Sequence, residues 1–202
     1  MIKKQRCNNV SIIPLTGGIE RLKKEFQVEL KWTAFPLHPE IPAEGVTLEQ
    51  LFAGRRVNIP EMLQRLEQTA SRLGLPFGAR RMSFSSRRAQ EAAKWAESRG
   101  KADEFHHAVF RAYFVDGKNL HEMETLSAAA RSIGLDGETL DEVLRNKTFK
   151  TAVDQDWLRS HHLGITAVPT FRMNGENLVG AKPYDQLAAF LTAQRVPVAQ
   201  GK

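Results

Sequence analysis

The fold is decided by Val168-Pro-Thr-Phe-Arg-Met173, the dipeptide Asn174-Gly175 and the segment Asn177-Leu-Val-Gly180. The two outer segments are rich in apolar and β-branched residues, which favour strands. Asn-Gly between such segments indicates a tight hairpin turn, because both residues tolerate positive φ angles. Apolar residues then recur at helical spacing over residues 183–193, so this part of the chain is predicted to be strand, strand, helix.

The N-terminal part predicts a shorter unit of helix and strand. Apolar residues at helical spacing indicate a helix over Ile19–Phe26, and strict alternation indicates a strand over Val28–Ala34 with one exposed face. Three prolines make residues 36–45 a loop. Residues 1–18 show no useful periodicity.

The chain between these parts is expected to be helical. Asn58, Pro60 and Glu61 form a good helix start, and amphipathic stripes follow as far as Ser160. Phe110 and Trp157 lie on such stripes, so we expect both to be buried. We expect no strand ladder within residues 58–160.

The resulting order is helix and strand, inserted helices, then two strands and a helix. We therefore predict an α/β class with a thioredoxin-like domain formed by residues 1–57 and 161–202. Residues 58–160 form an inserted helical domain in this interpretation. The opening Met1–Arg6 is too charged for a central buried strand, so the N-terminal strand is expected to be degenerate.

Composition excludes several classes of function. The 202 residues are 42% hydrophobic and 26% charged, as in a soluble globular protein, and no apolar run could cross a bilayer. The net charge of +6 is spread as short basic pairs, which argues against nucleic acid as a partner. The first residues lack the apolar core of a signal peptide, so we expect a cytoplasmic protein without membrane partners.

Five segments occur in succession: Ile19-Glu-Arg-Leu-Lys-Lys-Glu-Phe26, Trp32-Thr-Ala-Phe-Pro-Leu-His-Pro-Glu40, Phe105-His-His-Ala-Val-Phe-Arg-Ala-Tyr-Phe114, Gly164-Ile-Thr-Ala-Val-Pro-Thr-Phe171 and Val179-Gly-Ala-Lys-Pro-Tyr184. Together they resemble one family, the DsbA-type thioredoxin-fold oxidoreductases, and within it the FrnE-like branch. The resemblance implies a DsbA-like fold and the exchange of protein disulfides. It extends from about Ile19 to Leu191.

The family carries Cys-x-x-Cys before the first helix, where the helix N-terminus lowers the thiol pKa. Counting back from Ile19, the resemblance places this motif at Asn9, Val10, Ser11 and Ile12, none of which is cysteine. The single thiol, Cys7, lies two positions too early and has no partner. Dithiol exchange therefore cannot be transferred to this sequence as written, and residues 1–18 are either a degenerate segment or an artefact of frame or truncation.

The resemblance also implies a substrate-binding edge. The proline of Val168-Pro169 corresponds to a cis-proline in thioredoxin-fold proteins, and Ala167, Val168, Pro169 and Thr170 would pair with an extended peptide or glutathione. Ser86 and Arg87, at the start of a predicted helix, would hold a carboxylate of such a ligand. A plain helix cap by Ser86 is the simpler alternative.

Metal and cofactor chemistry have little support in the sequence. His106-His107 and His161-His162 are adjacent pairs whose side chains diverge by about 100° on a helix, so neither pair would converge on one ion. We predict no metal and no cofactor, with glutathione as a substrate or ligand only.

Three functions remain open. The first is a DsbA-like, FrnE-like oxidoreductase impaired in dithiol exchange, with an extended peptide or a small thiol as its partner. The second is a glutathione-dependent enzyme similar to kappa-type transferases or 2-hydroxychromene-2-carboxylate isomerases, which use serine near the place of Ser11. The third is a non-catalytic remnant that binds a peptide or protein partner. The oligomeric state stays open, a homodimer included.

Overall fold

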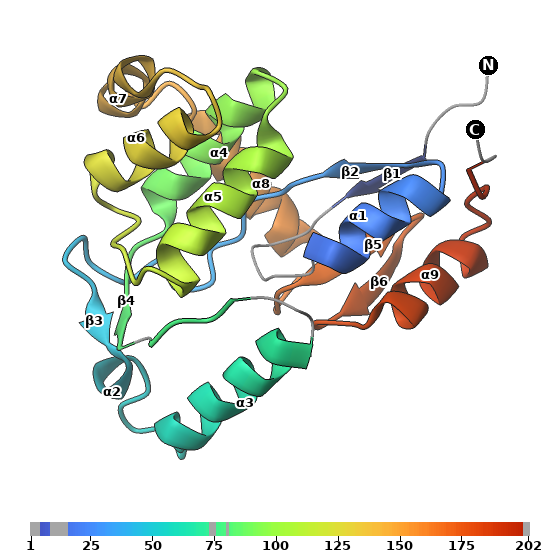
Figure 1. The fold of residues 1–202 in the computed structure, drawn as a ribbon, viewed down its shortest axis with the longest axis horizontal. Coiled ribbons are helices and arrows are strands. Elements are labelled where there is room, and N and C mark those ends of the chain that lie inside the picture. The colour runs from blue at the N-terminus through green and yellow to red at the C-terminus, as the bar shows by residue number, and fades with distance from the viewer. Residues whose placement is uncertain (1–4, 9–15, 73–75, 80, 200–202) are drawn as a thin grey trace. The chain divides into compact units, whose positions relative to one another are not determined.

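The computed structural model describes residues 5–8, 16–72, 76–79 and 81–199 (Figure 1). The chain divides into two compact units. We call Met1–Phe35 with Asp156–Lys202 the sheet unit, and Pro36–Gln155 the helical unit. Residues 36–57, which the sequence analysis assigned to the thioredoxin-like domain, belong to the helical unit because their strand Val46–Thr47 pairs with Met82–Ser83.

The N-terminal half of the sheet unit consists of β1 (Gln5–Asn8), α1 (Thr16–Glu25) and β2 (Val28–Lys31). β1 and β2 are parallel, with Cys7 opposite Leu30, and β1 also lies beside β5. A strand therefore forms where the charged sequence argued against one. This short strand overlaps the charged segment only at Gln5 and Arg6, and backbone N–H and C=O groups make the pairing whatever the side chains are.

The C-terminal half consists of β5 (Thr170–Met173), β6 (Glu176–Val179) and α9 (Tyr184–Ala193). The hairpin predicted from Asn174-Gly175 is confirmed, with φ angles of 50° and 92° at these two residues. α1 and α9 pack together with strands of both halves around one apolar core. Its buried members are Ile19, Leu22, Phe26, Val28, Phe171, Met173, Leu187, Leu191 and Val196.

The helical unit begins with two short elements, β3 (Val46–Thr47) and α2 (Leu48–Leu51), and the longer helix α3 (Ile59–Arg72). β4 (Met82–Ser83) follows and pairs antiparallel with β3. This two-residue ladder corrects the prediction of no strand within 58–160. Its partner lies more than thirty residues earlier, so no local pattern signals it.

The remaining helices are α4 (Arg87–Ser98), α5 (Ala102–Phe114), α6 (Met123–Ser132), α7 (Gly137–Arg145) and α8 (Lys150–His162). Residues 150–155 of α8 belong to the helical unit and residues 156–162 to the sheet unit. The core of the unit lies among α4 to α7, where small alanines of α4 allow close approach to Phe105, Leu126 and Leu140. None of the described helices is both long and apolar enough to span a membrane.

The two aromatic residues chosen from the helical stripes behave differently. Phe110 is buried, as predicted, but Trp157 is only half-buried, so its prediction was wrong. Val153, one turn earlier on α8, is fully buried, so it is this residue and not Trp157 that packs into the core. A bulky indole at the edge of a unit seldom becomes fully buried, whatever its helical spacing.

A polar cluster joins α1 to α9 on the surface of the sheet unit. The Tyr184 hydroxyl donates a hydrogen bond to Glu25, and Arg21 Nε donates to Glu25 Oε1 at 2.7 Å. The Arg21 guanidinium also lies 3.8 Å from the centre of the Tyr184 ring. The Tyr184 hydrogen bond first, and Arg21 second, hold the pKa of Glu25 below its ordinary value.

This cluster predicts a pH-dependent effect of Tyr184→Phe. Because the pKa of Glu25 is lowered in the folded state, its contribution to stability is present above the unfolded pKa and is lost as pH falls through the folded pKa. Tyr184→Phe should therefore lower the free energy of unfolding at pH 7, and the difference from wild type should shrink at strongly acidic pH. Urea unfolding at both pH values measures it.

The matched control is Tyr113→Phe, the same change at the chain's other tyrosine, whose hydroxyl lies 3.3 Å from Ser83 Oγ. Its effect should not follow the titration of Glu25. A Tyr184→Phe difference that stays constant from pH 7 to acidic pH would contradict the assignment of the hydrogen bond to the Glu25 carboxylate.

Candidate functional site

The loop Ala167–Thr170, which we call the Pro169 loop, leads directly into β5. The buried Thr170 hydroxyl donates to the Ala167 carbonyl at 2.7 Å. The Pro169 carbonyl accepts a hydrogen bond from the Gly180 N–H at 2.8 Å, which ties the loop to the end of β6. The Val168–Pro169 peptide bond is cis. The loop is thus held by hydrogen bonds on both sides of Val168.

Val168 itself presents a backbone donor. Its side chain is half-buried, and no acceptor for its N–H is found in the part of the chain that the structure describes. A backbone N–H held on a fixed loop can pair with the carbonyl of an added extended chain, the interaction by which peptides add to sheet edges. Ala167 to Thr170, the four residues predicted for this loop, thus form one short segment that is held by hydrogen bonds and presents the Val168 N–H.

Ser86 and Arg87 lie in the helical unit, so the two predicted groups of site residues belong to different units. Ser86 occupies the N-cap position of α4 but makes no side-chain cap; its hydroxyl accepts from Gln90 Nε2 at 3.2 Å. The simple helix cap considered in the sequence analysis is therefore not formed. The hydroxyl instead stabilises the first turn through a side chain four residues later.

Arg87 is engaged by groups of the protein. It forms ion pairs with Glu91 at 2.8 Å and Asp154 at 2.7 Å, and it donates to the Lys150 carbonyl at 2.9 Å. Burial lowers the pKa of Arg87, but the hydrogen bonds to Glu91 and Asp154 more than offset this and raise it. In this arrangement Arg87 ties α4 to the first turn of α8, and its charge is compensated without a ligand.

The expected motif position, Asn9 to Ile12, lies outside the described residues. Cys7 lies in β1 and not at a helix start. Because α1 begins at Thr16, a cysteine pair that adjoins the helix N-terminus would include Leu15, three positions after Ile12. The start of α1 is the signal that counting back from Ile19 could not supply.

The histidines do not assemble a metal site in the described parts of the chain, where no group of three or more His, Cys, Asp or Glu side chains could hold an ion. Burial lowers the pKa of His106 to about 3, so its imidazole is neutral at physiological pH. A neutral ring within α5 fits a packing role.

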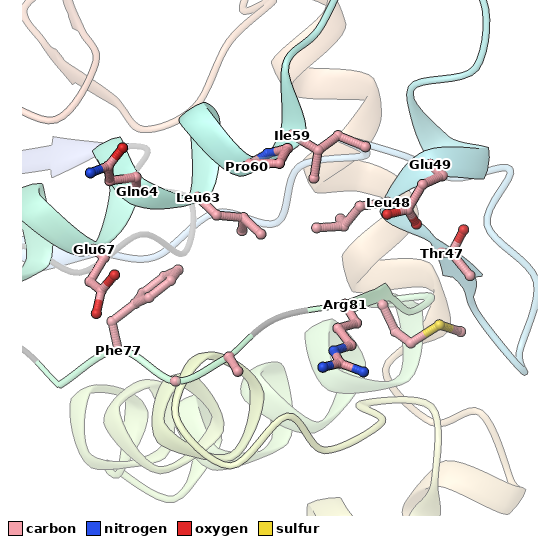
Figure 2. Close-up of a pocket in the computed structure, with 13 residues that line it drawn as sticks. Thr47, Leu48, Glu49, Ile59, Pro60, Leu63, Gln64, Glu67, Phe77 and Arg81 are labelled. Carbon is pink, nitrogen blue, oxygen red and sulfur yellow. The ribbon is translucent and has the colours of Figure 1, made fainter.

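A groove that sequence analysis missed lies in the helical unit, with a volume of about 930 Å³ (Figure 2). We call it the α3 groove. Apolar side chains from α2, α3, β4 and the segment 76–79 line it, chiefly Leu48, Ile59, Leu63, Phe77 and Met82. Because these residues come from separate segments, no single motif could have signalled it.

Comparisons with known proteins agree with this architecture. The model of the DSBA-like thioredoxin domain matches residues 16–192. The uncharacterized protein YwbO of Bacillus subtilis (strain 168) is 28% identical over 177 residues, which cover 84% of this chain and 84% of that protein. The chain belongs to the DSBA-like thioredoxin domain family.

Solved structures share the fold. A probable DsbA oxidoreductase from Streptomyces coelicolor superposes with a TM-score of 0.84 at 22% identity, covering 98% of this chain and 93% of that one. A 2-hydroxychromene-2-carboxylate isomerase gives a TM-score of 0.67 at 18% identity, with coverages of 88% and 85%. The cytosolic disulfide reductase DsbM from Pseudomonas aeruginosa with GSH gives 0.65 at 17% identity, with 94% and 98%.

The hydrogen bond inside the Pro169 loop predicts the effect of Thr170→Val. This nearly isosteric change removes the buried donor and leaves the Ala167 carbonyl without it, which should lower the free energy of unfolding by about 1–2 kcal/mol. Chemical denaturation measures the loss. Thr192→Val is the control, because Thr192 makes the same kind of bond to Ala188 but is exposed; its effect should stay within about 0.5 kcal/mol. Equal effects of the two changes would show that the Thr170–Ala167 hydrogen bond contributes no more to stability than an exposed bond of the same kind.

Proposed function

We propose that this chain is a DsbA-like protein of the FrnE-like branch that binds extended peptides or small thiols at the Pro169 loop and is impaired in dithiol exchange. The single observation that carries the proposal is that its 202 residues hold one cysteine. A cytoplasmic location fits a protein with no internal disulfide.

Disulfide exchange needs two thiols in sequence. An attacking thiolate forms a mixed disulfide, and a resolving thiol then displaces it so that the substrate leaves. Cys7 could make the first step: its sulfur bonds to one sulfur of a substrate disulfide, and the other sulfur leaves as a thiolate. No second thiol of this chain can then break the mixed disulfide. Cys7 also lies in β1 and not at a helix N-terminus, the position that activates thiols in disulfide-exchanging proteins.

The binding half of the proposal rests on the Pro169 loop. Its hydrogen bonds through Thr170 and Gly180 hold Val168 in place, and the Val168 N–H has no acceptor among the described residues. Such a donor fits a backbone carbonyl, which extended peptides and glutathione both carry. Recognition would then use main-chain groups and would not depend on the missing cysteines.

An insulin-reduction assay tests the redox half. The unmodified chain and Cys7→Ser should both give background rates. The pair Ile12→Cys with Leu15→Cys, which adjoins the start of α1, should gain turnover, whereas Asn9→Cys with Ile12→Cys should gain less, because its cysteines lie further from the helix N-terminus. Turnover by the unmodified chain that Cys7→Ser abolishes would overturn the proposal.

A glutathione-dependent enzyme is the second candidate. It is favoured by the likeness of the fold to DsbM, solved with GSH, and to a 2-hydroxychromene-2-carboxylate isomerase. In this alternative the bound glutathione supplies the thiol, so the missing cysteines would not matter. Glutathione-dependent isomerisation of 2-hydroxychromene-2-carboxylate would favour it over the first candidate.

Amide NMR distinguishes binding from its absence. Titration with reduced glutathione, and separately with an extended peptide, should shift the Val168 amide resonance, since that N–H gains an acceptor. The Gly180 amide serves as the control for direct contact, because it already donates to the Pro169 carbonyl and should shift less. Saturable shifts elsewhere with none at Val168 would show that the Pro169 loop is not the binding site.

A further inference from the structure

The α3 groove is a second candidate for ligand binding, independent of the Pro169 loop. Its volume of about 930 Å³ lies within the range of sites that hold organic ligands or peptide side chains. Figure 2 shows Leu63 of α3 and Leu48 of α2 pointing into the same space, with Phe77 at one end. The middle of the groove is therefore apolar.

One wall of the groove is firmly held. The Gly78 N–H donates to the Phe114 carbonyl at 2.8 Å, and a Cβ atom at Gly78 would lie 2.1 Å from the Val115 carbonyl oxygen. The Phe77 and Phe114 ring centres are 6.3 Å apart. At the other end, the Leu48 N–H donates to the Arg81 carbonyl at 3.1 Å. The segment that carries Phe77 thus packs directly against α5.

The opposite wall is a helix with little burial of its own. Of the 14 residues of α3, only Ala70 is buried, although Ile59 and Leu63 present apolar side chains to the groove. Local interactions support the helix, through the Asn58 cap on the Glu61 N–H and the Glu61–Arg65 ion pair. Helices of this length normally gain most of their stability from packing an apolar face, so an occupant of the groove would supply what α3 lacks.

The polar groups at the rim indicate what kind of occupant fits. Glu67 lies beside Phe77 at one end of the groove and Glu49 beside Thr47 at the other, with Arg81 near the second end (Figure 2). In the described residues none of these three charged groups has an ion-pair or hydrogen-bond partner for its side chain. A fatty acid carries a charge of one sign at one end, so it could not pair with all three of these groups. A polypeptide combines apolar side chains with charges of both signs, so it matches both the apolar middle and the rim.

We propose that the α3 groove binds an extended polypeptide segment whose apolar side chains are flanked by basic and acidic residues. Its apolar side chains contact Leu48, Leu63 and Phe77, and its charged residues pair with Glu49, Glu67 and Arg81. This site goes beyond the proposed function of the Pro169 loop, and it requires neither Cys7 nor Val168.

Fluorescence anisotropy with the full chain tests the proposal. The probe is a fluorescein-labelled peptide with a central block of four leucine and phenylalanine residues, a lysine on each side of the block and one glutamate beyond; a second peptide has serine in place of the block. The first should bind saturably and the second should not. Leu63→Glu should weaken binding at least 10-fold, because it places a charge in the apolar middle of the groove.

Leu66→Glu is the matched control, since it makes the same change one turn along α3 at a residue that is 38% exposed and does not line the groove. It should leave the affinity within about 2-fold. Glu67→Lys, a change at the surface, should also weaken binding, because the proposal pairs the Glu67 carboxylate with a lysine of the peptide. Circular dichroism of each variant confirms that the helices are retained, and Glu67→Lys keeps the test valid if Leu63→Glu does not fold.

Three outcomes would overturn the proposal. Saturable binding of dodecanoate without binding of the peptide would make the groove a site for small amphiphiles. Sedimentation showing a dimer that Leu63→Glu dissociates, again without peptide binding, would assign the groove to a second copy of the chain. Equal weakening by Leu66→Glu and Leu63→Glu would place the peptide elsewhere. Because Cys7→Ser should not change peptide affinity, failure of the redox proposal leaves this result unaffected.

Discussion

The sheet unit depends on apolar contact between two segments that are far apart in the chain. Ile19, Leu22 and Phe26 of α1 share a core with Phe171 and Leu187 from the C-terminal half. The C-terminal residues reinforce this pairing, because the Gln27 N–H donates to the Pro197 carbonyl and the Ala199 N–H to the Glu25 carbonyl, each at 2.8 Å. The Pro169 loop lies at the entrance to β5, so its arrangement depends on this core being formed.

Local spacing accounts for the elements that the sequence predicted well. The hairpin, α9 and the start of β2 are each encoded within a few neighbouring residues, and the structure places them within one or two residues of their expected bounds. The β3–β4 pairing and the partial exposure of Trp157 depend on residues distant in the chain. Periodicity reports which face of a helix is apolar, but not whether another element covers it.

The same distinction explains the candidate site. Val168 and Thr170 were predicted from the family resemblance, through a motif of neighbouring residues, and the Thr170–Ala167 hydrogen bond spans three residues. For Arg87 the sequence could suggest a free cation at a helix start, but not Asp154, which follows 67 residues later and pairs with it. The sequence shows where charged side chains occur, but not which of them form ion pairs. The ion pairs decide whether a charge is available to a ligand.

With a single thiol, this protein would depend on external thiols to release a disulfide-bonded partner, whereas a dithiol enzyme releases it with its own second thiol. A mixed disulfide formed at Cys7 would persist until an external thiolate attacked it, bonding to the partner's sulfur and releasing Cys7 as a thiolate. The lifetime of the complex would then follow the concentration of small thiols rather than an internal resolving step. The proposed non-covalent recognition through the Val168 N–H would have no such dependence, since a hydrogen bond to a backbone carbonyl requires no electron transfer. In the proposed function, binding and redox chemistry are therefore separable, because only the redox steps would need a cysteine pair.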